Sequence, residues 1–396
     1  MKSKNNKIKI DHQLINDYYN LMKNKCNKNN PLDGVINDVP SRIVAIGDIH
    51  GDFFYLIQEL KLAKLINDKN KWIGKDAILV SVGDLIDRCR KIPCVKSTND
   101  ENSDIKILKF FTKLHNEAIT YGGAVYSLIG NHELMNVSGD FRYVSGANID
   151  NFEKHSENQE FLINLPEGLA NEDARKWSFQ PGNPLAEFLA CTRLGILKIG
   201  PFLFSHAGVI PQLAEKYNIS DINKILSLYL FNKLDKNHFD QYNLHELLGP
   251  SIKVDGLKLN NEQIINSSKT SFVWTRIFGN LEHASNEICK EVFNPVKELW
   301  KIGVMFIGHT PKFDGIQSVC TNKNGDGIIY LDHGVSRGFD AVDINNRSKG
   351  RNPQVVEIIN KKLYKKSNKT YEHCNIKIIY ENEFFIIRVL KKKQQI

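Results

Sequence analysis

The stretch Ser41-Arg-Ile-Val-Ala-Ile-Gly-Asp-Ile-His-Gly-Asp52 is the starting point for interpreting this chain. Residues 43–46 form a short apolar run rich in β-branched side chains, which predicts a buried strand. The run ends at Gly47, and Asp48 and His50 follow at once. A rigid strand that delivers a carboxylate and an imidazole into a glycine-bounded loop is one way to build a metal site.

Four further apolar runs end in the same way, each at a loop that presents Asp, Asn or His, usually beside glycine. The runs are 77–82, 124–129, 196–204 and 304–307, and the loops open with Gly83-Asp84, Gly130-Asn131, Ser205-His206 and Gly308-His309. Ligands of α/β sheets gather at the carboxyl ends of the strands. We therefore expect the five loops to converge on one point.

The remaining pattern predicts a single catalytic domain over residues 39–390 with two insertions. Apolar residues at helical spacing predict helices over 53–65 and 105–121. The insertions, at about 134–194 and 211–271, lack strong strand signals. Three strands are expected over 355–359, 375–380 and 384–390. A polar segment (1–38), with one helical stretch around 14–22, precedes the domain, and a basic tail (391–396) follows it.

Composition limits the classes of protein that need to be considered. The 41% of apolar residues in 396 suffices for a large core, and no apolar stretch is long enough to predict a membrane-spanning helix or a secretory leader. Seven cysteines without regular spacing predict a reduced, cytoplasmic protein with neither a disulfide framework nor a cysteine-type zinc site. The net charge of +8 comes from the two ends, so we read solvated tails and expect no nucleic-acid or membrane partner.

The side chains of the five loops form a set of oxygen and imidazole donors without thiolate, which suits manganese, iron or zinc. Six ligands are too many for one tetrahedral zinc and fit two ions that share a carboxylate, for which Asp84 is placed. Two such ions activate water and clamp phosphoryl oxygens, so hydrolysis of a phosphate ester is the expected reaction. The predicted ligands are Asp48, His50, Asp84, Asn131, His206 and His309.

Other polar residues of these loops have roles that this chemistry requires. His132 follows a ligand and is placed to act as general acid to the leaving oxygen, with Asp87 to hold its tautomer. Arg88 offers a planar fork for phosphate oxygens, and Arg276 or Arg142 could supply a second clamp.

These motifs resemble those of the phosphoprotein-phosphatase branch of the calcineurin-like metallophosphoesterases. The matching blocks are Gly47-Asp-Ile-His-Gly51, Gly83-Asp-Leu-Ile-Asp-Arg88, Gly130-Asn-His-Glu133, Ser205-His-Ala-Gly208 and Gly308-His-Thr310. Gly130 to Val144, together with Trp274-Thr275-Arg276, makes the chain most similar to the Shewanella-like protein phosphatases. The resemblance covers about Arg42 to Gly338.

The resemblance implies an αββα sandwich with helical insertions and two metal ions, manganese first and iron or zinc as alternatives. It implies the six ligands and the His132–Asp87 pair as assigned, with Arg88 and Arg276 on the substrate phosphate. The expected activity is hydrolysis of phosphoserine, phosphothreonine or phosphotyrosine in a protein or peptide, by direct attack of water activated by the two ions. His333 is expected to have a structural role.

One departure from the family pattern is Cys89, which stands where the family usually has glycine. If that position required φ > 0, cysteine would strain the loop that holds Arg88 by about 1 kcal/mol. We expect Cys89 itself to be a passive thiol.

Two other functions of the protein stay open. One is a diadenosine polyphosphate or other nucleotide phosphohydrolase on the same scaffold, and the other is a non-catalytic phosphopeptide-binding module. A regulatory subunit is not indicated by any motif.

Overall fold

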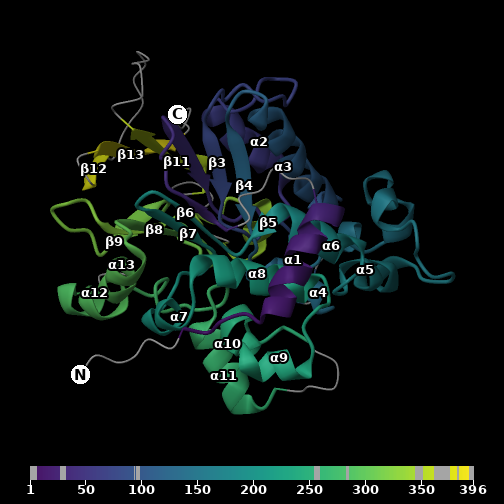
Figure 1. The fold of residues 1–396 in the computed structure, drawn as a ribbon. Coiled ribbons are helices and arrows are strands. Elements are labelled where there is room, and N and C mark those ends of the chain that lie inside the picture. Colours follow the sequence, from purple (N-terminus) through teal and green to yellow (C-terminus); the bar gives the residue numbers. More distant parts are fainter. Residues whose placement is uncertain are drawn as a thin grey trace.

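The computed structural model describes residues 7–26, 33–92, 94, 99–253, 259–281, 285–343, 351–360, 375–380 and 383–391. Within these residues two β-sheets face each other, and helices cover their outer faces (Figure 1). The predicted αββα sandwich in a single domain is confirmed. Of the predicted tail 391–396, residues 392–396 lie outside the described residues.

One sheet has seven strands and contains the opening strand of the chain near its centre. Strands β2, β3, β4 and β5 run parallel, while β11 and β13 pair in antiparallel fashion on the other side of β2. In spatial order the strands are β12 (Asn375–Tyr380), β13 (Glu383–Lys391), β11 (Gln354–Asn360), β2 (Arg42–Ile46), β3 (Ile78–Ser81), β4 (Ala124–Leu128) and β5 (Arg193–Leu194).

The second sheet has six strands, of which β7, β8 and β10 run parallel to one another. In spatial order they are β1 (Val35–Ile36), β6 (Ile196–Ile199), β7 (Phe202–Ser205), β8 (Val304–Ile307), β10 (Gly327–Tyr330) and β9 (Gln317–Val319). The prediction of one strand over 196–204 is wrong. The chain reverses at Gly200, which has φ +53°, so β6 and β7 form an antiparallel hairpin. The apolar pattern continues through this turn and conceals it.

A hydrophobic core fills the space between the two sheets. The side chains of Ile43, Val80 and Ile358 from one sheet are buried in the same cluster as Phe204 and Phe306 from the other. The Phe204 and Phe306 rings stack with their centroids 4.8 Å apart. Burial of these side chains holds the sheets together and so fixes the relative position of the loops at the ends of their strands.

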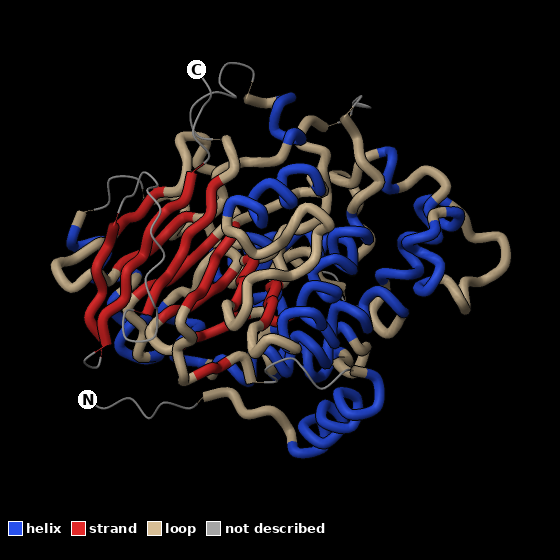
Figure 2. The backbone as a smooth tube through the Cα atoms, turned by 90° about the horizontal axis from the view of Figure 1, so that it is seen from above, coloured by secondary structure: helices blue, strands red, loops and turns tan. Residues whose placement is uncertain are grey.

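Helices pack on the outer faces and fill the two insertions. Helices α2 (Phe53–Leu62) and α3 (Asp104–Ile119) contact the seven-stranded sheet, and α8 (Ile219–Leu230) contacts β6 of the other. Figure 2 shows the strands together on one side of the molecule and most helices beyond them. The first insertion forms α4 (Asn131–Val137), η1 (Gly146–Asn148), η2 (Phe152–Lys154), η3 (Ser156–Phe161), α5 (Asn171–Phe179) and α6 (Pro184–Thr192).

The second insertion is helical as well, and a further pair of helices precedes β8. Their bounds are α7 (Pro211–Lys216), α9 (Lys236–Gln241), α10 (Leu244–Leu248), α11 (Asn261–Thr270), α12 (Asn286–Val292) and α13 (Asn294–Trp300), with a short 3₁₀ turn η4 (Arg337–Ala341) after β10. Across the described residues, every helix is too short or too polar to traverse a lipid bilayer.

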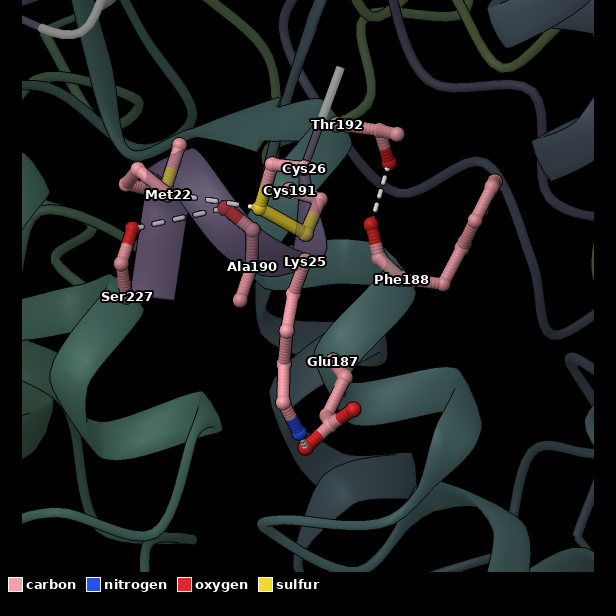
Figure 3. The surroundings of a disulfide bond; sticks show 9 residues. All are labelled: Met22, Lys25, Cys26, Glu187, Phe188, Ala190, Cys191, Thr192 and Ser227. Atoms are coloured by element: carbon pink, nitrogen blue, oxygen red, sulfur yellow. Dashed lines mark hydrogen bonds and ion pairs between the residues drawn. A yellow bond between two sulfur atoms is a disulfide. The ribbon is translucent and has the colours of Figure 1, made fainter. Parts of the chain in front are cut away.

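The N-terminal helix α1 (His12–Lys25) lies against the domain, in agreement with the predicted helical stretch. Its buried side chains Leu14, Tyr18 and Met22 recur every four residues and so form one face of the helix, which contacts α8. At its end Cys26 forms a disulfide with Cys191 of α6, and the adjacent Lys25 pairs with Glu187 (Figure 3).

The expectation that the chain has no disulfides is wrong. Besides Cys26–Cys191, the structure contains Cys89–Cys94 and Cys289–Cys320. Cys26 and Cys191 are 165 residues apart in sequence and meet because α1 and α6 both pack against α8. Spacing along the chain carries no sign of such a contact. The cytoplasmic location stays a prediction.

We expect the inter-sheet core to carry much of the stability. Ile358 is 1% exposed within this core, whereas Ile163 is 80% exposed. Ile358→Ala should lower the free energy of unfolding by about 2–5 kcal/mol, because it removes buried methyl groups and leaves a cavity. Ile163→Ala should change it by less than about 0.5 kcal/mol. Urea unfolding of both variants measures the difference, and equal losses would contradict this view of the core.

The Cys26–Cys191 bond should stabilise the fold, because it closes a very long loop in the unfolded chain. Cys26→Ser is expected to lower the free energy of unfolding by about 2–5 kcal/mol. The measurement is thermal unfolding of wild type and variant with and without dithiothreitol. Since reduction also opens Cys89–Cys94 and Cys289–Cys320, a Cys289→Ser variant serves as the control for loss of a different disulfide. A wild type and a Cys26→Ser variant of equal stability under oxidising conditions would count against this stabilising role.

Candidate active site

Six parallel strands, three from each sheet, end at one edge of the sandwich and supply the polar cluster. From the seven-stranded sheet, β2 leads to Asp48 and His50, β3 to Asp84 and β4 to Asn131. From the other sheet β7 leads to His206, β8 to His309 and β10 to Asp332. All seven side chains are buried. The predicted convergence of the strand ends therefore occurs.

Asp84 lies at the centre of the cluster. Its Oδ2 is 3.3 Å from His206 Nε2 and 3.8 Å from both His50 Nε2 and His132 Nε2. Its Oδ1 accepts a hydrogen bond from the backbone N–H of His132 at 3.0 Å. Asp84 therefore lies close to histidines from both sheets, and its role as a carboxylate shared by two ions stays a prediction.

The three predicted histidine ligands are held in the same way. In each, one ring nitrogen faces the cluster and the other faces a backbone carbonyl, and this second contact fixes the tautomer that leaves a lone pair for a metal. His50 Nδ1 is 3.4 Å from the Ile86 oxygen, His206 Nδ1 is 3.0 Å from the Val82 oxygen, and His309 Nε2 is 3.1 Å from the Trp274 oxygen. Asn131 Oδ1 lies between His206 Nε2 (3.0 Å) and His309 Nδ1 (2.8 Å).

The pKa shifts in the cluster follow from burial and mutual proximity. Burial raises the pKa of Asp48 well above its ordinary value, and Asp332 and Asp84 raise it further. Burial also raises that of Asp84, but His206, His132 and His50 outweigh it and hold this pKa well below its ordinary value. Burial lowers the pKa of His50 and of His309 well below the usual range, which keeps both rings neutral as metal ligands must be.

The cluster fits metal ions on two further observations. Asp48 Oδ1 and Asp332 Oδ2 are buried oxygens without a hydrogen-bond partner in the described part of the chain. Glycines make room beside the carboxylates, since a Cβ added at Gly308 would collide with Asp48 and one at Gly130 with Asp84. Three groups of residues could each hold an ion, namely His50–Asp84–His132, Asp84–His206–His309 and Asp48–His50–Asp332.

His132 and Asp87 form the predicted pair. His132 Nδ1 is 2.8 Å from Asp87 Oδ2, so Nε2 is the nitrogen that faces the cluster. The other Asp87 oxygen accepts a hydrogen bond from Asn136 at 2.8 Å. Asp87 is completely buried. Its contacts with His132 and Asn136 fix the position of its carboxylate.

Sequence reasoning missed the residues that hold this pair in place. Arg175 of α5 is fully buried and donates to Asn136 Oδ1 and to Asp104 Oδ2, while its Nη2 is 3.8 Å from Asp87 Oδ1. Glu133 accepts hydrogen bonds from the backbone N–H groups of Gly130, Asp84 and Leu85. Glu133 stood inside a quoted motif, whereas nothing in the chain marked Arg175 within its insertion.

The two predicted phosphate ligands occupy different positions. Arg276 donates to the His309 carbonyl and to Thr310 Oγ1, both at 3.2 Å, and is exposed beside the cluster. The Arg88 side chain instead lies in a buried acidic pocket, where Nη1 donates to the Gly51 carbonyl (3.0 Å) and is 3.4 Å from Asp52 Oδ2 and 3.7 Å from Glu101. The structure therefore does not bring the Arg88 guanidinium to the six predicted ligands.

The remaining candidates have structural surroundings. Arg142 is exposed and pairs with Asp140 of its own turn. His333 is buried with Nε2 3.2 Å from Glu59. Cys89 is absent from the described non-glycine residues with positive φ, so the expected strain does not arise. Cys89 is bonded to Cys94, which corrects the expectation of a passive thiol.

Comparison with known proteins agrees with this geometry. Residues 41–313 match the calcineurin-like phosphoesterase family. Uncharacterized protein R398 of Acanthamoeba polyphaga mimivirus is 34% identical over 65% of this chain and 96% of its own length. Shewanella-like protein phosphatase 2 of Arabidopsis thaliana is 27% identical over 76% of this chain and 72% of its length. A cold-active protein tyrosine phosphatase of a psychrophilic Shewanella superposes with a TM-score of 0.53, at 19% identity, over 82% of this chain and 76% of its own.

The chain belongs to the calcineurin-like phosphoesterase family. The predicted resemblance, including the similarity to Shewanella-like protein phosphatases, is confirmed. The prediction of an enzyme of the metallophosphoesterase type that hydrolyses phosphoric monoesters is confirmed as well. The family implies divalent metal ions, and the buried Asp, His and Asn cluster is the candidate for holding them.

The space that glycine leaves beside Asp48 should be required for metal binding. Gly308→Ala is expected to lower the amount of bound manganese per chain, because its Cβ would displace the Asp48 carboxylate. Gly122→Ala is the control, since its Cβ meets open space and only its positive φ of +77° is strained. Metal analysis after dialysis against manganese provides the measurement, and equal manganese content in the two variants would refute the expectation.

Proposed function

We propose that this protein is a metal-dependent phosphoprotein phosphatase that hydrolyses phosphomonoesters of serine, threonine or tyrosine side chains. The observation that carries the proposal is that the candidate metal cluster and the His132–Asp87 pair lie side by side at one edge of the sandwich. Histidines and buried carboxylates surround Asp84, and the His132–Asp87 pair stands beside them. The similarity to a named protein phosphatase and to a protein tyrosine phosphatase supports a phosphorylated protein or peptide as substrate.

Asp48, His50, Asp84, Asn131, His206 and His309 would hold two ions, with manganese preferred and iron or zinc as alternatives. When bound, such ions lower the pKa of a water molecule and neutralise phosphoryl oxygens. Asp332, which lies in one of the candidate metal groups, adds a third carboxylate to the cluster. The extra negative charge of that carboxylate would further favour cations at this site.

His132 would supply the proton that the leaving group needs. The water oxygen forms the new bond to phosphorus as the ester P–O bond breaks, and the departing alkoxide or phenoxide takes the proton from His132 Nε2. Asp87 holds Nδ1–H and so directs Nε2 to the reacting centre. Attack is direct, without a phosphorylated enzyme intermediate. Arg276, whose side chain donates to the His309 carbonyl, would hold a phosphate oxygen.

The first insertion would shape the substrate cleft, and its residues Asn136 and Arg175 also hold Asp87. The Tyr143 ring packs edge-on against His132, with the ring centroids 4.9 Å apart. An aromatic wall beside the general acid would contact the side chain that carries the phosphate. A phosphotyrosine ring and a phosphoserine methylene differ in the area that such a wall can cover.

Turnover of defined substrates tests the proposal. The panel is phosphoserine, phosphothreonine and phosphotyrosine peptides and diadenosine tetraphosphate, with manganese. We expect hydrolysis of at least one phosphopeptide class, and a loss of about 10²–10⁴ in kcat for His132→Asn at unchanged manganese content. His155→Asn, which changes a partly buried histidine outside the cluster, should leave kcat unaltered.

Two results would contradict the proposal. Cleavage of diadenosine tetraphosphate alone would indicate a nucleotide phosphohydrolase on the same scaffold. Binding of two ions and of phosphopeptide, without any turnover, would indicate a phosphopeptide-binding module.

A further inference from the structure

Arg90, two residues after Arg88, reaches into the polar cluster. Its Nη2 donates to the Asp87 carbonyl at 2.7 Å and contacts His50 Nδ1, while Nη1 is 3.2 Å from His132 Nε2. The Arg90 guanidinium therefore touches a predicted ligand and the proposed general acid. Arg88, which the motif singles out, is directed away to Asp52.

Aromatic rings and a short disulfide loop hold Arg90 in this position. The guanidinium carbon is 5.1 Å from the centroid of the Phe339 ring and 5.5 Å from that of Tyr143. Contacts of this kind favour a flat, weakly hydrated cation such as arginine over lysine. The Cys89–Cys94 bond closes the loop in which Arg90 lies, which restricts the backbone that carries it.

The guanidinium also has donors that lack acceptors. Its Nε is buried and has no hydrogen-bond partner among the residues that the structure describes. If His50 binds a metal through Nε2, Nδ1 carries its hydrogen toward the Ile86 carbonyl and cannot accept from Arg90. His132 Nε2, in its role as general acid, likewise presents a hydrogen. Apart from the Asp87 carbonyl, Arg90 then has no acceptor among the described residues, and its remaining N–H groups can donate to an anion from outside the chain.

We propose that Arg90 binds the phosphate group of the substrate between the metal cluster and His132. A guanidinium presents parallel N–H groups that match two phosphate oxygens, and in Arg90 these groups lie on Nη1 and Nη2, beside His132 and His50. This inference rests on the proposed function and adds to it a phosphate ligand that the motif pattern assigns to Arg88. Phosphate bound there lies against Nε2 of His132, as proton transfer to a leaving oxygen requires.

Calorimetric titration of the manganese-loaded full chain with inorganic phosphate tests the proposal without need of turnover. We expect Arg90→Ala to weaken phosphate binding about 10- to 100-fold, because it removes charged hydrogen bonds. Lys91→Ala removes an adjacent, exposed positive charge and is the matched control, expected to stay within about twofold of wild type. If Arg90→Ala does not fold, Arg90→Lys provides the test, because it keeps the positive charge and loses the planar guanidinium. Its affinity for phosphate is expected to fall about tenfold.

The outcomes separate phosphate binding from other roles of Arg90. Unchanged or tighter phosphate binding in the Arg90 variants would overturn the proposal and indicate a side chain that blocks the site. A loss of bound manganese would also overturn it, in favour of a brace for His50. Failure of the wild-type protein to bind phosphate would overturn the proposal as well. If wild type binds phosphate but hydrolyses no phosphopeptide, the phosphatase function fails while the Arg90 result still stands.

Discussion

The buried carboxylates at the strand ends are the constraint on which the rest of this structure depends. Asp48, Asp84 and Asp332 lie within one cluster, and two of them keep a buried oxygen with no partner in the described chain. An ionised carboxylate removed from water without compensation is unfavourable by several kcal/mol. Bound cations would remove this penalty, which is why the cluster is the candidate metal site. The histidines His50, His206 and His309, each with one nitrogen on a backbone carbonyl, complete a set of donors suited to cations.

Because the cluster takes strands from both sheets, the inter-sheet core is also a determinant of the site. The seven-stranded sheet contributes Asp48, His50, Asp84 and Asn131, and the other sheet contributes the two remaining histidines. Neither half holds a full ligand set. A shift of one sheet relative to the other would therefore change every distance across the cluster, including the 3.3 Å between Asp84 and His206. Close packing of Phe204 on Phe306 and their neighbours resists such a shift.

The sequence was sufficient to predict the parts of the site that are local in the chain. Each ligand directly follows an apolar strand, so Asp48, His50 and His309 could be placed from their neighbours alone. The hairpin at Gly200, the Arg175–Asp104 pair and Cys26–Cys191 could not be predicted, since each depends on how distant segments pack. The direction in which the Arg88 side chain points could not be predicted for the same reason. Asp52 and Glu101, which hold its side chain, come from separate loops and have no fixed spacing from it.

Backbone strain at the site shows how the fold maintains this arrangement. His50, Asp84, Asp87 and His309 all have positive φ, between 45° and 70°, a region that non-glycine residues rarely adopt. Such residues are unfavourable by about 1–3 kcal/mol each and persist only where the surroundings determine them fully.

Those surroundings are polar contacts more than apolar ones. Glu133 holds the backbone of Asp84, Asp104 accepts from the N–H of Asp87, and Asp48 accepts from the N–H of His309. In the last contact a predicted ligand fixes the strained backbone of another, so occupancy of the site and local conformation are coupled. Removal of the cations would therefore expose unpaired carboxylates and release the contacts that maintain these φ angles. On this argument the strand-end loops, rather than the sheets, are the part of the fold whose order depends on metal.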